Sequence, residues 1–170
     1  RGQVPVLVDG DQAVTQIVAI TLYLDEKFPQ SAFLPTSGMA RAKALETLAW
    51  MNNTVHPTFT HVFLPQKFSP GAGVQADIKA NAIKAYKGLM GELQNLVAHT
   101  KQAGHPWLGG AHIGALDAYA LTLARWGTIA GVGPQDFPAL WDYVHKVATN
   151  EAVAKVIARE RLQLNLMASS

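Results

Sequence analysis

Hydrophobic and polar positions divide the chain into a short N-terminal part with strand-like spacing and a longer part with helical spacing. Apolar side chains occupy both sets of alternating positions over residues 4–8, so the sequence predicts a strand that is covered on both faces. A tight Asp9-Gly10 turn and a second short strand follow. A helix is predicted over residues 15–27 because apolar residues recur there at helical spacing, and Phe28-Pro29 ends it, since proline disfavours helical backbone in the residue before it.

The chain after residue 38 has helical spacing throughout. Residues 29–38 are rich in turn-forming residues and separate the two parts, so we predict a linker there, with Phe33-Leu34 as an apolar plug. The helices predicted after this linker cover residues 39–62, 76–100, 114–129, 138–149 and 151–162. The predicted fold class is therefore a small α+β N-terminal part followed by an all-α helical bundle domain.

Composition narrows the classes of function. The chain has no cysteine, which excludes disulfides, thiolate metal sites and a cysteine nucleophile within it. The net charge is +2 and both signs are scattered, so nucleic acid is not expected as a partner. The most apolar long window, residues 113–132, contains Asp117 and Arg125, which are costly in a bilayer, so we expect no membrane partner and a soluble, cytoplasmic protein. His56 and His61 are five residues apart and poorly aligned on a helix, and no metal site is predicted.

Five short motifs lie along the chain in a fixed order. They are Gly2-Gln3-Val4-Pro5-Val6-Leu7, then Thr15-Gln16 with Ala19-Ile20 and Tyr23-Leu24, then residues 41–50 with His56, then Trp107-Leu108-Gly109-Gly110, and last Asp117-Ala118-Tyr119 with Arg125-Trp126. Each motif is weak alone, but their order and spacing together are specific. By this combination the chain resembles the glutathione S-transferase family, most closely its bacterial forms, over nearly all of its 170 residues.

The resemblance implies a division of the chain. Residues 1–28 would be the C-terminal half of a thioredoxin-like glutathione-binding domain, residues 29–38 the interdomain linker, and residues 39–170 the all-α C-terminal domain. The strand-helix-strand that opens such a domain would precede Arg1, so we expect the chain to be part of a longer protein. The residue that usually stabilises the glutathione thiolate, a Tyr, Ser or Cys near the first strand, would lie in that preceding segment.

The resemblance also implies where glutathione binds. The implied binding residues are Gln3, Val4, Pro5, Gln16 and Ile17. A cis bond before Pro5 would turn the amide and carbonyl of Val4 toward the cysteinyl backbone of glutathione. The alternative is an ordinary trans proline at the start of a strand.

The start of the first predicted helix is the second part of this implied site. Exposed backbone amides and the helix dipole favour an anion there, and the family places the γ-glutamyl carboxylate at this position. Gln16 matches the family's acidic or amide residue, but Ile17 replaces the serine that usually follows, so only its backbone amide can donate. The alternative is that Thr15 serves only as the N-cap of the helix.

His56 is the candidate auxiliary catalytic residue. In bacterial members of the family a histidine at the matching place borders the glutathione thiol, which it could polarise or orient as a neutral imidazole or as an imidazolium. Asn52 and Asn53 can share its helix face. The alternative is a helix-ending histidine that is satisfied by a backbone carbonyl, with Pro57 just after it.

Two further roles are assigned by position. Phe59, Phe63 and Trp126 are placed near an apolar pocket for the second substrate, because such pockets form preferentially between domains. Asp117, three residues after Gly114, is predicted to cap the helix that follows by accepting a hydrogen bond from the Gly114 amide. This role is structural, so replacing Asp117 should destabilise the protein before it inactivates it.

Two classes of function follow from the resemblance. In the first, the protein is a glutathione transferase involved in detoxification: glutathione is the co-substrate, no metal takes part, and the thiolate attacks a small hydrophobic electrophile. Such an enzyme would be a homodimer. In the second, the protein is a non-catalytic, glutathione transferase-like binding or scaffold protein, and Ile17 and Gly114 are early signs of relaxed constraint.

Overall fold

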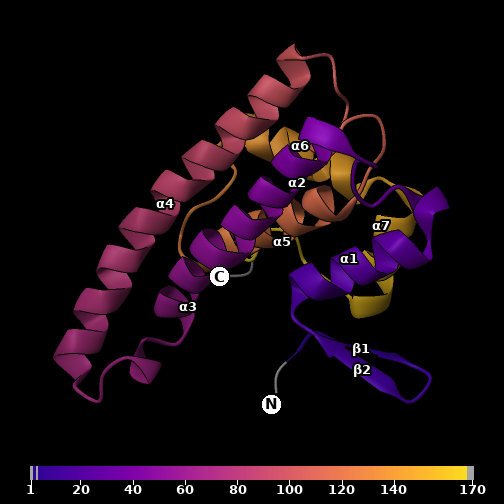
Figure 1. The fold of residues 1–170 in the computed structure, drawn as a ribbon. Coiled ribbons are helices and arrows are strands. Elements are labelled where there is room, and N and C mark those ends of the chain that lie inside the picture. The colour runs from indigo at the N-terminus through magenta and orange to yellow at the C-terminus, as the bar shows by residue number, and fades with distance from the viewer. Residues whose placement is uncertain (1, 3, 168–170) are drawn as a thin grey trace.

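A β-hairpin and one helix form the N-terminal part of the computed structural model, which describes residues 2 and 4–167. Strand β1 (Val6–Asp9) pairs antiparallel with strand β2 (Gln12–Thr15) in a two-stranded sheet. Helix α1 (Ile17–Lys27) follows the hairpin directly (Figure 1). The order of elements in this part is the one that the sequence predicts.

Because of the register of the hairpin, α1 begins at Ile17 and not at residue 15 as predicted. Gly10 supplies the positive φ of 60° that a two-residue hairpin loop needs at its first position. With this loop Thr15 pairs with Val6 inside the sheet, and Gln16 occupies the N-cap position of α1 without a side-chain cap. The interpretation of Thr15 as the N-cap is therefore wrong, because strand pairing holds its backbone in the hairpin.

The rest of the chain is helical. After a short 3₁₀ turn, the elements are α2 (Gly38–Trp50), a π-helical turn (Met51–Val55), α3 (His56–Phe63), a second 3₁₀ turn (Pro65–Lys67), α4 (Ala72–Gln102), α5 (Ala115–Ile129), α6 (Pro138–Ala148) and α7 (Glu151–Glu160). All predicted helices are present, and the one predicted over residues 39–62 is a single helical run with a π-helical turn in its middle. The longest helix, α4, runs along one side of the molecule in Figure 1.

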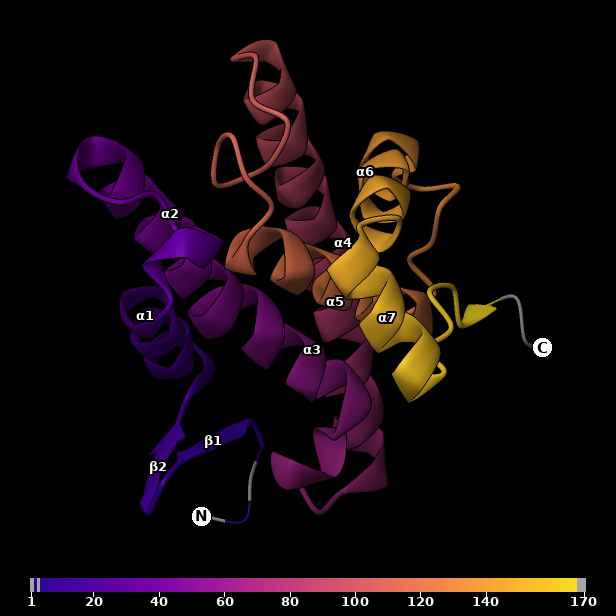
Figure 2. The ribbon, with the colours of Figure 1, turned by 90° about the vertical axis from the view of Figure 1, so that its right-hand side faces the viewer.

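Helix α5 is the centre of the helical part. It contacts α2, α3, α4 and α6, which surround it in the two views of Figures 1 and 2. Its sequence is apolar on most sides, as is typical of a buried helix. The buried residues of α5 are Leu116, Asp117, Tyr119, Ala120, Leu121, Leu123, Ala124, Gly127 and Thr128.

A buried carboxylate organises the start of α5. Asp117 is fully buried, and its Oδ2 accepts a hydrogen bond from the amide of Gly114 at 2.7 Å. Its Oδ1 accepts from the amide of Leu108 at 2.9 Å and from the hydroxyl of Tyr143. Burial, and then the charge of Asp117, raise the pKa of Tyr143, so this hydroxyl keeps its proton and donates. These contacts are the ones that a structural cap requires.

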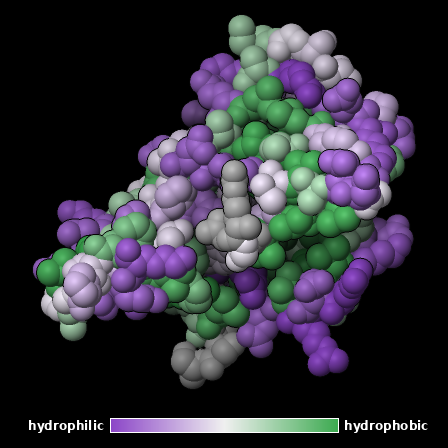
Figure 3. Space-filling model, turned by 60° about the horizontal axis from the view of Figure 1, so that its bottom comes forward, coloured by the Kyte–Doolittle hydropathy of each residue, from purple (hydrophilic) through white to green (hydrophobic). Residues whose placement is uncertain are grey.

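The hairpin is more exposed than its alternating pattern predicts. Val6 is 49% exposed and Val8 is 67% exposed. The prediction of a strand covered on both faces is therefore wrong for the described part of the chain, because the sheet has two strands and these side chains have no covering layer there. Figure 3, which views the molecule from below, shows hydrophobic residues reaching the surface on this side.

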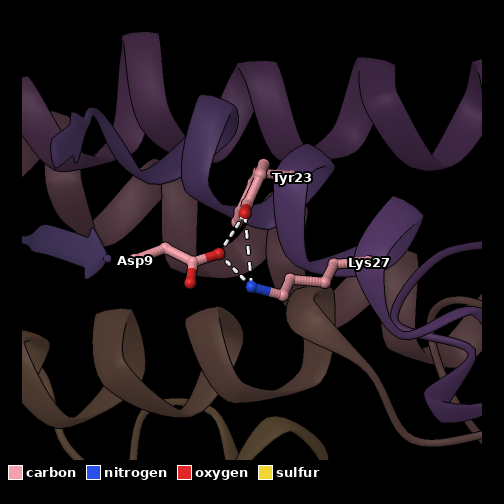
Figure 4. A network of polar contacts seen from close by, with 3 residues as sticks. All are labelled: Asp9, Tyr23 and Lys27. Atoms are coloured by element: carbon pink, nitrogen blue, oxygen red, sulfur yellow. Dashed lines mark hydrogen bonds and ion pairs between the residues drawn. The ribbon is translucent and has the colours of Figure 1, made fainter. Parts of the chain in front are cut away.

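A polar network joins the tip of the hairpin to α1 (Figure 4). Asp9, at the end of β1, accepts hydrogen bonds from the Tyr23 hydroxyl and the Lys27 ammonium group of α1. The hydrogen bond from Lys27, and then the one from Tyr23, lower the pKa of Asp9 below its ordinary value. The network orients the hairpin on α1, but because it is exposed to solvent we expect it to add little to stability.

Candidate functional site

An open cavity of about 860 Å³ lies between the N-terminal part and the helical part. The lining residues of the N-terminal part are Gly2, Val4, Pro5, Thr15, Gln16, Ile17 and Thr21. Those of the α2–α3 run and the turn after it are Leu48, Asn52, His56, Thr60, Leu64 and Lys67, and those of α5 are Ala115, Ala118, Tyr119, Thr122 and Trp126. Small-molecule sites form preferentially in such clefts between two parts of a fold.

Helix geometry produces the helical wall of this cavity. From Leu48 to Leu64 the lining residues recur every four positions, so a single face of the α2–α3 run borders the cavity along its length. The π-helical turn (Met51–Val55) lies in the middle of this run, directly before His56. Such turns occur frequently at functional sites, where they adjust the direction of the side chains that follow.

An ion pair holds the two walls of the cavity together. Arg41 of α2 donates from Nη1 to Oδ2 of Asp25 on α1 at 2.7 Å, and to the carbonyl of Pro35 at 2.9 Å. The other carboxylate oxygen of Asp25 accepts from the amide of Leu34 at 3.1 Å. The side chain of Asp25 is only 10% exposed. One carboxylate thus connects α1, the segment that follows it, and α2.

The cavity brings together four of the five residues implied for glutathione. Val4, Pro5, Gln16 and Ile17 all line it, while Gln3 lies outside the described residues. The bond between Val4 and Pro5 is cis, as predicted. Val4 is 92% exposed, so its backbone is accessible from the cavity.

Gln16 has an unusual backbone at the mouth of α1. Its φ of 75° and ψ of 121° lie in a region that residues other than glycine rarely adopt. Strained residues of this kind are found most often at ligand sites. The amide of Ile17 opens α1, where first-turn amides have no partner within the helix, and no acidic residue occupies this turn. An anion placed here would meet free donors and the positive end of the helix dipole.

Replacing Gln16 with glycine is expected to raise the free energy of unfolding by about 1 kcal/mol. Strain at such a position costs roughly 1–3 kcal/mol, and glycine returns about 0.5–1 kcal/mol of this gain through its greater chain entropy. Urea denaturation measures the difference. The control is Gln12→Gly in β2, which is expected to lose about 0.5–1 kcal/mol because its backbone is an ordinary strand. Equal losses in both variants would contradict the strain at Gln16.

His56 meets two aromatic residues of α5. Its Nδ1 lies 2.8 Å from the hydroxyl oxygen of Tyr119, and its ring packs edge to face on Trp126 with 4.8 Å between the ring centres. Burial lowers the pKa of His56, so the imidazole is neutral near pH 7. Burial also raises the pKa of Tyr119 to about 12, so the phenol keeps its proton.

The surroundings of His56 agree with the sequence-based expectations only in part. The alternative of a helix-ending histidine bonded to a carbonyl is wrong, because α3 begins at His56 and its ring partner is the hydroxyl of Tyr119. Asn52 lines the same face of the cavity as His56, and its side chain donates to that of Asn53 at 2.8 Å. The ring and its partners therefore belong to the wall between α3 and α5.

One of the three aromatic residues predicted for the second substrate lines the cavity, and the other two pack behind it or beside it. Trp126 lines the cavity, but Phe59 and Phe63 are not among its lining residues. Phe59 is buried and stacks on Trp126 with 5.0 Å between ring centres, while Phe63 is exposed and stacks on Phe59 with 5.9 Å between ring centres. The reason is helical phase: α3 directs His56 and Thr60 toward the cavity, and so places Phe59 toward the core. Phe59 supports Trp126 from behind.

Sequence reasoning missed part of the wall. Tyr119 was visible only as one letter of a motif, although it precedes Trp126 by seven residues, the spacing that puts both on one face of a helix. Thr21 of α1 was not singled out, and it lines the cavity.

Among the described lining residues, Lys67 carries the one Lys, Arg, Asp or Glu side chain, so the wall holds no carboxylate that would repel an anionic ligand.

No group of three or more His, Cys, Asp or Glu side chains within residues 2 and 4–167 is placed to hold a metal ion. In the same part of the chain, every helix is too short or too polar to cross a bilayer.

Comparison with known proteins gives a consistent result. The chain is 30% identical over 170 residues to glutathione S-transferase GST-4.5 of Xanthomonas campestris, covering 95% of this chain and 77% of that protein. It is 29% identical over 127 residues, 74% of this chain, to the uncharacterized GST-like protein YncG of Escherichia coli. Among solved structures, a sphingomonad glutathione S-transferase complexed with glutathione superposes with a TM-score of 0.78 at 26% identity, covering 95% of this chain and 76% of that one. No protein-family model matches the chain.

These matches test the predicted fold class and show how much of its relatives' length the chain spans. The superposition confirms the predicted fold class, a small α+β part followed by a helical domain. The chain spans 58% of the length of YncG and about three quarters of the other two proteins.

Proposed function

Because this chain belongs to the glutathione S-transferase family, we propose that it binds glutathione in the cavity and promotes attack of the glutathione thiolate on a small hydrophobic electrophile. Its enzyme class would then be glutathione transferase, with glutathione as co-substrate. One observation carries the proposal. Four residues that the resemblance implies for glutathione line the same cavity as His56, which lies about 40 positions further along the chain. These four are Val4, Pro5, Gln16 and Ile17.

The proposed place of glutathione follows from the chemistry of the two walls. The γ-glutamyl carboxylate would lie against the first turn of α1, where Gln16 and the amide of Ile17 can donate hydrogen bonds. The accessible backbone of Val4 can pair with the cysteinyl backbone, as an added strand pairs with a sheet edge. Glutathione is anionic at neutral pH, and the absence of carboxylates among the described lining residues favours an anionic ligand in this cavity.

The reaction depends on the thiolate of glutathione. A thiol with a pKa of about 8.5 is only a few per cent ionised at pH 7, and the thiolate is the reactive nucleophile. A hydrogen-bond donor placed near the sulfur would favour the ionised form. His56 is the candidate donor in this chain, and Trp126 provides an apolar surface for the electrophile at the same end of the cavity.

A second candidate function is a non-catalytic binding or scaffold role on the same fold. The observation that favours it is Ile17, which replaces the hydroxyl residue that the family usually places at the start of this helix. The lost hydroxyl removes one donor to the carboxylate, which costs about 1 kcal/mol.

Homodimer formation, as is usual for the family, is proposed for either function, and light scattering would measure it.

Calorimetric titration of the purified protein with glutathione tests the proposal. We expect saturable binding, and about tenfold weaker binding by Gln16→Asn, because the shorter amide loses a hydrogen bond to the anionic carboxylate. Asparagine is enriched at positive φ, so this variant adds less backbone strain than most other shorter side chains would. Gln12→Asn, in the exposed strand β2, is the matched control and should bind as the natural chain does. A folded protein that takes up no glutathione would favour the scaffold function.

A further inference from the structure

We infer that Tyr119 is a positioning residue: it holds His56 in the tautomer whose remaining N–H, on Nε2, faces the cavity as a hydrogen-bond donor. The geometry of this pair stands on its own, while its consequence for the glutathione sulfur rests on the proposed function. A histidine at this place could act as a hydrogen-bond donor or as a general base, and this tautomer makes His56 a donor.

The contact between the two side chains is short and well defined. Nδ1 of His56 lies 2.8 Å from the hydroxyl oxygen of Tyr119, within the normal range for a hydrogen bond. Tyr119 is a buried residue of α5, the central helix, so its ring cannot move without disturbing the core. Within the described residues, His56 Nδ1 is the one hydrogen-bond partner recorded for this hydroxyl.

The donor in this bond can be assigned from chemistry. A phenol, with an ordinary pKa near 10, is a far better donor than the N–H of a neutral imidazole, and an imidazole nitrogen is a better acceptor than a phenol oxygen. The Tyr119 hydroxyl therefore donates and Nδ1 accepts. Since a neutral imidazole carries one proton, that proton lies on Nε2.

The ring of His56 is fixed from two directions by the same helix. Tyr119 holds Nδ1, and Trp126, two turns further along α5, packs edge to face against the ring at an interplanar angle of 75°. No described residue hydrogen-bonds Nε2, and His56 lines the cavity. The free N–H is thus available to a ligand in the cavity.

In this tautomer His56 acts as a hydrogen-bond donor and not as a general base. A histidine that accepted the proton of the thiol would need an unprotonated Nε2, and the bond from Tyr119 disfavours that tautomer. A neutral Nε2–H instead donates to a sulfur that is already ionised and stabilises it as a thiolate. Loss of the Tyr119 hydroxyl would let the imidazole change tautomer and rotate, so a share of the molecules would lose the donor.

Long-range ¹H–¹⁵N correlation of the histidine rings tests the assignment in the protein without any ligand. We expect the natural chain to show a protonated Nε2 and an unprotonated Nδ1 at His56, and Tyr119→Phe to show a mixture of both tautomers. The control is Tyr86→Phe, which removes a buried hydroxyl that donates to the Leu123 carbonyl at 2.7 Å and does not line the cavity. Its His56 signals should be unchanged. A protonated Nδ1 in the natural chain, or the same spectrum in Tyr119→Phe, would overturn the inference.

Ultraviolet titration of bound glutathione tests the consequence. Tyr119→Phe is expected to lower the ionisation constant of the bound thiol about three- to tenfold, the effect of one hydrogen bond, with the affinity for glutathione little changed. His56→Ala should lower it at least as much, and the double variant no further. If the tautomer is as expected but glutathione does not bind, the positioning role stands and the proposed function fails. If glutathione binds and its ionisation is the same in all variants, the donor role is overturned.

Discussion

Replacing Asp117 with alanine should lower the free energy of unfolding by about 3–5 kcal/mol, because a fully buried carboxylate that accepts three hydrogen bonds is lost and each donor left unsatisfied costs roughly 1–3 kcal/mol. The donors are the amides of Gly114 and Leu108 and the hydroxyl of Tyr143, and the Leu108 amide alone keeps a second acceptor, the Tyr143 oxygen at 3.1 Å. They belong to the start of α5, to the loop before it and to α6. Urea denaturation followed by circular dichroism measures the loss.

Two controls separate this effect from a general loss of charge. Asp142→Ala, at an exposed position of α6, should change stability by no more than about 0.5 kcal/mol. Asp117→Asn keeps the shape and one acceptor, so its loss should be smaller than that of the alanine variant. A stability of Asp117→Ala close to that of Asp142→Ala would mean that the start of α5 does not depend on the carboxylate.

Replacing Gly114 with alanine is expected to destabilise the protein by about 3 kcal/mol. A Cβ built on Gly114 would lie 2.3 Å from the carbonyl oxygen of Phe33, which is backbone and cannot rotate away. That same carbonyl accepts a hydrogen bond from the amide of Ala115 at 3.1 Å, so relieving the clash would also weaken the bond that docks this segment on α5. Overpacking in a tight interior costs about 1–3 kcal/mol before any lost hydrogen bond is counted.

Gly88→Ala is the matched control for this prediction. Gly88 is an exposed position inside α4 with no atom within 4 Å of an added Cβ. Alanine is about 0.5–1 kcal/mol more favourable than glycine inside a helix, so this variant should be more stable. Opposite signs for the two variants are therefore expected in thermal unfolding. A stable Gly114→Ala would show that the segment before α2 can shift, and the contacts between the cavity walls with it.

The close packing around Gly114 changes the interpretation of why a glycine occupies this position. From the sequence, glycine in place of the usual Ser or Thr indicated relaxed constraint. In the structure no larger residue fits without moving the Phe33 carbonyl. The departure from the family's pattern is therefore explained by close packing, and it no longer favours a non-catalytic function. Ile17 remains the departure that does.

The local signals of the sequence were sufficient for most elements. Apolar spacing located every helix within a few residues, because a helix that packs on a core must present one apolar face to it. The Asp9-Gly10 turn predicted the hairpin, since glycine at that place permits the positive φ of a two-residue loop. The motif around Asp117 predicted its bond to the Gly114 amide, which depends on only three residues of spacing.

Contacts between distant segments could not be read in the same way. The pattern around Thr15 permits an N-cap, and pairing with Val6 across the hairpin decided that it is part of a strand. The spacing of Phe59 permits a place in the cavity wall, and the phase of α3 against α5 turned it to the core. The partner of His56 lies 63 residues away, beyond the reach of any local pattern.

The sequence by itself determined the order of elements, the fold class and the cis bond before Pro5. Each of these depends on short-range spacing or on a short motif. Only the tertiary structure decided which side chains share the cavity, that Asp25 and Arg41 connect its walls, and that Tyr119 holds His56. The reason is physical: the relative rotation of packed helices is set by the fit of many side chains at once, and the sequence of one segment does not determine it.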